Sequence, residues 1–197
     1  MYSNYPTLAQ KVIPGSAGLT RNVMLAVGGS LLLWASARLQ VPFYPVPMTM
    51  QTFVVLMIGA AYGWRLGAAT VALYLLQGAL GMPVFAGTPE KGIGLAYMVG
   101  PTGGYLIGYV AAAAVTGALA GLGWDRRVST TILSMLAGTA VIYAFGIGWL
   151  GMVVGWDKPV FAWGLTPFLL GDLIKLALAA AILPTTWKLI AGHSSSR

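Results

Sequence analysis

The sequence predicts an all-α integral membrane protein, folded as a compact bundle of six transmembrane helices with both termini in the cytoplasm. Three observations support this fold: the composition, the six long apolar segments, and the distribution of Lys and Arg. Hydrophobic residues make up 58% of the 197 residues and charged residues 8%, with a mean hydropathy of +0.81. Soluble domains contain about 25% charged residues. The composition therefore excludes a soluble protein, and we expect a single transmembrane domain over residues 1–197.

The charge and the cysteine content exclude further classes. The formal charge is +7, but the basic residues stand singly or in pairs at the ends of apolar segments. No basic run with interleaved aromatic residues exists, so we expect no nucleic-acid partner. The chain has no cysteine, which excludes disulfides and Cys-ligated metals. We expect no metal and no cofactor.

Residues 1–20 contain prolines and glycines and lack the basic-then-apolar order of a signal peptide. They are predicted to form an N-terminal tail or interfacial segment. The first helix is predicted over 21–40, where Arg21 and Arg38 can extend their charged ends to the two membrane interfaces.

Two small residues lie four positions apart in this first helix. Ala26 and Ser30 have the spacing that permits close approach between helices in lipid. They indicate either a face that docks a partner or packing inside the bundle, and the sequence leaves both open.

The next helices are separated by Pro- and Gly-rich connections. Three prolines in 41–47 exclude a helix there. The second and third helices are predicted over 48–64 and 66–82, with a tight connection at Arg65. A Gly/Pro-rich loop follows over 83–94.

The fourth helix is predicted over 95–122, the fifth over 128–154 and the sixth over 167–188. Residues 100–105, GPTGGY, resemble a phosphate-binding turn only superficially. They lack the Gly-Lys-Ser/Thr ending of a P-loop and follow no strand, so we reject a nucleotide site. The glycines indicate bare backbone near a bound molecule or closely packed helices.

The basic residues predict the orientation. Six spans place both termini on one side, and the two sides carry seven and three basic residues: Lys11, Arg21, Arg65, Arg126, Arg127, Lys188 and Arg197 against Arg38, Lys91 and Lys158. Because positive charge accumulates on the cytoplasmic side, we expect both termini there and a multi-pass protein of the cytoplasmic membrane.

Asp172 and Lys175 are the main functional clue. They lie three residues apart in the sixth segment, a spacing that puts both side chains on one helix face. A charge inside a bilayer costs about 2.5–3.5 kcal/mol on insertion scales, so such residues usually face a cavity. The two charges either contact a ligand or only neutralise each other. With Gln51 and residues 100–105, they are predicted to surround an outward-facing cavity.

Four motifs in order resemble the BioY biotin-transporter family over nearly the whole chain. They are PVPMTMQT at 45–52, GMPVFAG at 81–87, GPTGGY at 100–105 and PFLLGDLIK at 167–175. The resemblance implies the substrate-binding S-component of an energy-coupling-factor (ECF) vitamin transporter, with high-affinity biotin uptake as its function and not catalysis.

The resemblance also implies partners. They are a transmembrane coupling subunit, docked through Ala26 and Ser30, and two cytoplasmic ATPase subunits. This chain has no P-loop. Some family members occur without the ATPase module, and the sequence leaves that question open, together with a homo-oligomer.

In the implied site, Asp172 accepts a hydrogen bond from a ureido N–H of biotin and Lys175 donates to the ureido oxygen. Gln51 adds a further donor or acceptor. Some relatives carry a basic residue directly after the Gly-Gly-Tyr motif, where this chain has Leu106. The ligand carboxylate is therefore expected to bind elsewhere, at Lys91 or at backbone N–H groups of the 83–94 loop.

Aromatic residues complete the predicted site. Tyr105, Phe85 and Phe43 either cover the ring and tail of the ligand or serve as membrane-interface aromatics. Gly87, from the second motif, is predicted to belong to the same site.

Other functions stay open at this point. A carrier or solitary transporter for another small vitamin or carboxylate has the same sequence features. An intramembrane enzyme is disfavoured because no His or Cys lies in a predicted span to activate a serine, so we expect no catalytic residues. A scaffold without a ligand is the third alternative.

Overall fold

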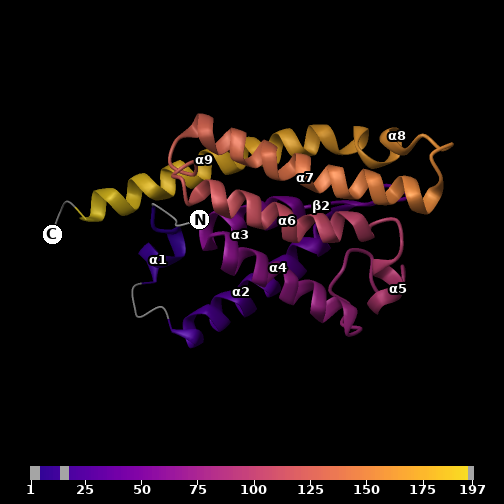
Figure 1. The fold of residues 1–197 in the computed structure, drawn as a ribbon, viewed down its shortest axis with the longest axis horizontal. Coiled ribbons are helices and arrows are strands. Elements are labelled where there is room, and N and C mark those ends of the chain that lie inside the picture. Colours follow the sequence, from indigo (N-terminus) through magenta and orange to yellow (C-terminus); the bar gives the residue numbers. More distant parts are fainter. Residues whose placement is uncertain (1–4, 14–17, 195–197) are drawn as a thin grey trace.

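The computed structural model describes residues 5–13 and 18–194, so part of the predicted N-terminal segment (1–4 and 14–17) and residues 195–197 lie outside the described residues. Within the described ranges, six helices of twelve or more residues form a bundle (Figure 1). They are α2 (Leu19–Arg38), α3 (Gln51–Tyr62), α4 (Trp64–Ala79), α6 (Gly103–Ala120), α7 (Val128–Val154) and α9 (Leu169–Ser194).

Shorter elements connect these helices. They are α1 (Leu8–Val12), β1 (Gln40–Val41), β2 (Met48–Thr49), α5 (Gly94–Met98), α8 (Val160–Gly164) and the 3₁₀ turn η1 (Thr166–Phe168). The two strands pair antiparallel, with Gln40 opposite Thr49 and Val41 opposite Met48. In α1, Thr7 and Gln10 form a reciprocal capping box, which explains how so short a helix begins.

Several predicted helix boundaries differ from the structure. The connection predicted at Arg65 lies at Gly63, and Arg65 belongs to α4. Met48 and Thr49 form a strand, and the helix begins only at Gln51. The predicted fourth helix is divided into α5 and α6, with a turn at Pro101 between them. Proline lacks the N–H that a continuing helix needs and disfavours helical backbone at the residue before it, which explains the break.

By length and composition, three helical stretches are long and apolar enough to cross a membrane: Gly103–Ala120, Val128–Val154 and Val160–Ala191. Helix α3 is apolar but shorter. The structure is thus mostly helical with three clear apolar spans, and the count of six spans stays a prediction.

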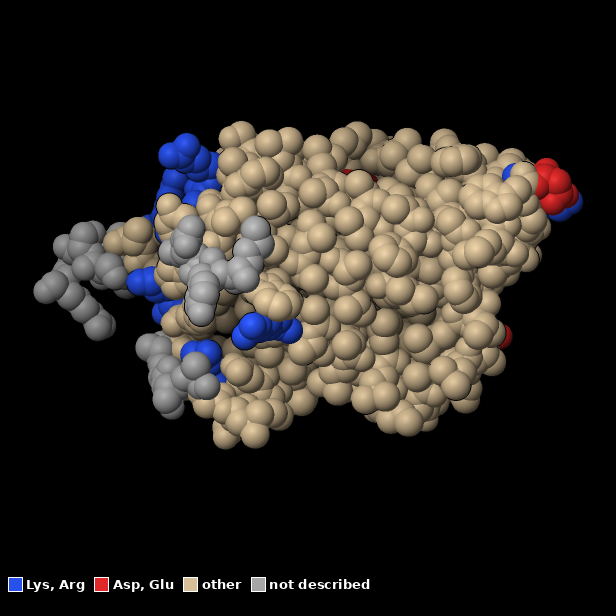
Figure 2. Space-filling model, in the orientation of Figure 1, with Lys and Arg blue, Asp and Glu red and all other residues tan. Residues whose placement is uncertain are grey.

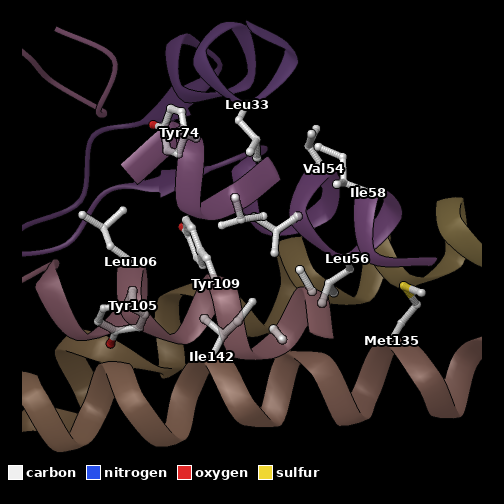
Figure 3. Packing of buried hydrophobic residues seen from close by; sticks show 14 of the residues in the cluster. Leu33, Val54, Leu56, Ile58, Tyr74, Tyr105, Leu106, Tyr109, Met135 and Ile142 are labelled. Carbon is white, nitrogen blue, oxygen red and sulfur yellow. The ribbon is translucent and has the colours of Figure 1, made fainter. Parts of the chain in front are cut away.

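Helix α6 lies at the centre and packs against α3, α4 and α7 (Figures 1 and 3). Glycines make this close packing possible. A Cβ added at Gly59 of α3 would lie 2.5 Å from the carbonyl oxygen of Ala113, and one at Gly117 of α6 would lie 2.4 Å from the nitrogen of Trp64. Both distances are shorter than any real contact, so only glycine fits.

The beginning and the end of the described chain meet at one end of the bundle (Figure 1). The guanidinium of Arg126 lies 4.5 Å from the ring centre of Tyr5 and 4.2 Å from that of Trp187, in α9. Most Lys and Arg residues in view gather at this end, while the long middle of the visible face is almost uncharged (Figure 2). We call the end where these basic residues gather the basic end.

Candidate functional site

A cavity of about 580 Å³, open solvent included, lies among the first turns of α3, α6 and α9 and the middle of α7. Its wall combines apolar side chains, such as Leu106, Ile142 and Phe168, with a few polar ones. The connections before α3 and after α4 also contribute, through Pro47 and Ala86. Mostly apolar walls with a few placed polar groups are typical of small-molecule sites.

Asp172 and Lys175 line this cavity from one face of α9. Lys175 Nζ lies 3.1 Å from Asp172 Oδ1, and the two side chains are 11% and 17% exposed, respectively. Lys175 Nζ also donates to Thr52 Oγ1 at 2.9 Å. Tyr143 Oη, from α7, donates to the other carboxylate oxygen, Asp172 Oδ2. The couple thus links α3, α7 and α9 in one network.

This network leaves hydrogen-bonding capacity for a ligand. An ammonium group has three hydrogens, and Lys175 uses two of them within the described contacts. Each carboxylate oxygen of Asp172 accepts one bond and can accept another. A neutral molecule that offers both N–H groups and a carbonyl oxygen matches these free positions.

Gln51 lines the cavity at the start of α3 and is held at both ends of its amide. Its Nε2 donates to Tyr74 Oη at 2.6 Å, and its Oε1 accepts from Thr49 Oγ1 at 3.3 Å. Tyr74 Oη in turn donates to the carbonyl oxygen of Val84 at 2.8 Å. Gln51 is therefore connected through Tyr74 to the loop after α4.

That loop is also held from α2 and from α5. The guanidinium of Arg38 donates to the carbonyl oxygens of Pro83 and Thr88 at 2.8 and 3.1 Å. Tyr97 Oη, from α5, donates to the carbonyl oxygen of Ala86 at 2.8 Å. Since Ala86 and Tyr97 both line the cavity, these bonds fix the part of the loop that forms its wall.

Tyr105 lies in the cavity wall, as do two further tyrosines of α6 and α7, Tyr109 and Tyr143. Tyr105 Oη donates to the carbonyl oxygen of Gly164 at 2.8 Å, which ties α6 to the end of α8. Tyr109 is buried and lies among the core side chains (Figure 3).

Four predicted substrate-binding residues do not line the cavity, and three of them lie in the loop after α4. Phe85 is 1% exposed and packs in the core, where its ring lies 5.5 Å from Tyr74 and 5.0 Å from Tyr97. Gly87 takes a positive φ of 75° and its carbonyl accepts from the backbone N–H of Lys91, so it shapes the loop. Lys91 is exposed on that loop, and carboxylate binding by it stays a prediction.

The remaining predicted residues lie behind the wall or away from it. Phe43 packs edge-on against Phe168, a wall residue, at 6.2 Å between ring centres. Ser30 is 0% exposed, and Gln77 Nε2 of α4 donates to its Oγ at 3.2 Å. Its side chain packs between α2 and α4, and docking of a partner through this helix stays a prediction. Ala26 is half-buried on α2.

Sequence reasoning missed Tyr143 and Thr52, the two neutral partners of the charged couple. A signal existed for Tyr143, because its hydroxyl is the only one in the sequence of 140–154, where the other residues are apolar or glycine. Buried hydroxyl groups in such a place need partners. Thr52 lay within the PVPMTMQT motif but had no feature to distinguish it from its neighbours.

Comparisons with known proteins fit this geometry. The sequence profile of the BioY family matches residues 7–192. The chain belongs to the BioY family.

Curated BioY proteins are similar over most of their length. A protein of Pyrococcus horikoshii named probable biotin transporter BioY is 40% identical over 146 residues, which cover 74% of this chain and 83% of that protein. The biotin transporter BioY of Thermotoga maritima is 40% identical over 153 residues, which cover 77% and 86%.

A solved structure shares the fold. The crystal structure of the S-component for biotin from an ECF-type ABC transporter superposes with a TM-score of 0.73. The match covers 89% of this chain and 95% of that one at 23% sequence identity. At that identity, the likeness shows a shared fold alone.

Proposed function

We propose that this chain binds biotin with high affinity and takes it up across the cytoplasmic membrane, as the substrate-capture subunit of an ECF transporter. The observation that carries this proposal is the enclosed Asp172–Lys175 couple in the wall of an otherwise mostly apolar cavity, in a chain of the BioY family. Named biotin transporters among its relatives support biotin as the substrate.

The free positions of the couple match the ureido ring of biotin. A ureido N–H donates to Asp172, and the ureido oxygen accepts the third hydrogen of Lys175. Hydrogen bonds that involve a charged group are roughly twice as strong as neutral ones. Leu106, Ile142 and Phe168 offer the apolar surface that the thioether ring and aliphatic tail require.

A ligand recognised by shape alone would bind independently of the Asp172–Lys175 couple, whereas biotin affinity should depend on its hydrogen bonds. Removing one partner of a hydrogen bond to a charged group costs about 1.5–3 kcal/mol, which corresponds to about a tenfold to a hundredfold loss of affinity. Biotin binding by Asp172→Asn and Lys175→Ala should weaken by this amount in isothermal titration. Lys158→Ala is the matched control, because Lys158 pairs with Asp157 at the surface.

Parent-like affinity in both variants would show that the site is misassigned. If the couple only neutralises charge within the fold, both variants will lose thermal stability and keep their affinity for biotin.

The choice of ligand and of partners needs two further measurements. A thermal-shift panel of small vitamins and carboxylates separates biotin from alternatives, because a ligand that binds the folded state raises its stability by mass action. Radiolabelled biotin uptake in cells that make this chain with and without the coupling and ATPase subunits tests the ECF partnership. Uptake that does not change when the module is supplied would exclude that partnership.

A further inference from the structure

A second and larger cavity lies at the basic end of the bundle, away from the predicted substrate site. It has a volume of about 1180 Å³, open solvent included, and lies between α1, the first turns of α2 and the α3–α4 connection. Two arginines line it, Arg21 from α2 and Arg65 from α4. Asn22 and Gln10 add polar groups to the same wall.

The arginine charges in this cavity have no counter-ion in the chain. The sequence has only four acidic residues, and the structure describes all of them. Asp125 bonds to Trp187, Asp157 and Asp172 pair with neighbouring lysines, and Glu90 lies in the loop after α4. None of the four lines the cavity.

One guanidinium nitrogen of the two arginines is buried without a hydrogen-bond partner among the described residues. Nε of Arg21 is buried and makes no hydrogen bond within the described part of the chain. Buried polar groups in proteins almost always have a partner, so an unpaired guanidinium nitrogen beside a large cavity points to a ligand that supplies an acceptor. Guanidinium groups match phosphate oxygens in geometry and charge.

Apolar side chains of the lining and of the adjoining surface of α2 form what we call the apolar rim. Leu25, Trp64 and Leu66 belong to the lining, and Trp64 is 41% exposed. Beside it, α2 presents Val23, Met24 and Val27 outward. Cationic side chains beside apolar surface and a tryptophan are the arrangement expected where a phosphate headgroup meets its acyl chains.

We propose that the Arg21–Arg65 cavity binds the phosphate headgroup of an anionic phospholipid from the leaflet at the basic end. The two guanidinium groups hold the phosphate, and the acyl chains leave over the apolar rim along α2. The lipid supplies the negative charge that the chain lacks there and connects α1 and α2 to the α3–α4 connection.

Native mass spectrometry in micelles that contain phosphatidylglycerol or phosphatidylcholine tests this proposal. We expect the parent to retain one phosphatidylglycerol and to lose phosphatidylcholine. In Arg21→Gln/Arg65→Gln the retained fraction should fall about tenfold or more, because both charge-assisted contacts are lost. Arg127→Gln removes the same charge from an exposed position at the same end and should bind like the parent.

Two controls keep the result decisive. Arg65→Gln alone changes an exposed side chain, so it should fold, bind biotin like the parent and lose part of the lipid retention. An excess of inorganic phosphate should not displace the lipid. Equal retention of both lipids, full retention in the double variant, or displacement by inorganic phosphate would each overturn the proposal.

Discussion

Asp172 is held between a phenol and an ammonium, and this arrangement explains how a carboxylate stays in an apolar bundle. Lys175 compensates its charge, while Tyr143 and Thr52 satisfy the remaining polar atoms of the pair. Buried ion pairs are tolerated when such additional hydrogen bonds are present. The four side chains therefore act as one polar unit, and removing a neutral member should affect the charged ones.

Tyr143→Phe removes only the hydroxyl that donates to Asp172. We expect biotin affinity to fall about tenfold, because the carboxylate loses a bond worth about 1.5 kcal/mol or more and is no longer held toward the ligand. Isothermal titration measures this, with Tyr44→Phe, a change at an exposed loop residue, as the control. Unchanged affinity in Tyr143→Phe would mean that the hydroxyl does not position Asp172.

Asp125, in the connection between α6 and α7, is a buried acid outside the predicted membrane spans. Trp187 Nε1 donates to its Oδ2 at 2.6 Å, whereas Oδ1 is enclosed without a partner among the described residues. Burial raises the pKa of the Asp125 carboxyl above its usual value, against the opposing effect of the Trp187 bond. The charged form is thus less favourable in the folded state than in the unfolded one.

Asp125→Asn should therefore change how stability depends on pH. A carboxyl with a raised folded-state pKa favours folding below the unfolded pKa of about 3.9 and loses this contribution as pH rises through its folded pKa. Asparagine keeps an acceptor for Trp187 and has no charge. We expect parent and variant to melt alike near pH 4 and the variant to be the more stable of the two at pH 7. A parent that is the more stable of the two at pH 7 would contradict this.

At the scale of elements, glycines determine how closely α3, α4 and α6 approach. Gly59 and Gly117 lie where backbone meets backbone, and no side chain fits at either position. Small residues at helix contacts are the usual means of tight association in lipid. The tight packing of α3 on α6 also positions Gln51 and Tyr109 on the cavity wall.

Gly59→Ala tests this packing. Its Cβ would lie 2.2 Å from Thr116 Oγ1 and 2.5 Å from the oxygen of Ala113, so the helices must separate. We expect a loss of about 1–3 kcal/mol in thermal unfolding, the usual cost of overpacking. Gly28→Ala is the matched control, since a Cβ there meets nothing within 4 Å. Equal melting temperatures for the two variants would show that α3 and α6 can separate at little cost.

The sequence predicted where the long helices lie better than it predicted where side chains point. Apolar length and proline positions locate helices, but β2 and the break between α5 and α6 depend on local pairing. Phe85 was predicted to cover the ligand or to lie at the membrane interface and instead packs in the core, because hydropathy in a membrane chain does not separate lipid-facing from buried positions. Asp172 and Lys175 were identifiable because charge in such a segment requires enclosure.

At the scale of the molecule, charge is separated along the bundle axis. Basic residues gather where the described chain begins and ends, and the pair Asp157–Lys158 lies in the connection near α8 (Figures 1 and 2). The positive-inside rule assigns the basic end to the cytoplasm. The cytoplasmic location of the basic end is thus a prediction from the sequence.

The lack of cysteine makes the orientation directly testable. A single cysteine at Lys158 should react with a membrane-impermeant thiol reagent on intact cells. One at Arg127 should react only after the cells are permeabilised. Both positions are exposed, so access to the reagent depends on the side of the membrane. Labelling of Arg127→Cys on intact cells would reverse the topology.

The bond chain from Gln51 through Tyr74 to Val84 has a thermodynamic consequence for the whole molecule. A ligand atom that competes for the Gln51 amide also weakens the bonds that fix the loop in the cavity wall. Ligand binding and the position of the loop are therefore thermodynamically coupled. Linkage makes this coupling reciprocal. Tyr74→Phe, at a residue outside the cavity lining, should therefore shift both biotin affinity and loop protection in hydrogen exchange, and an effect on only one of them would show that the two are independent.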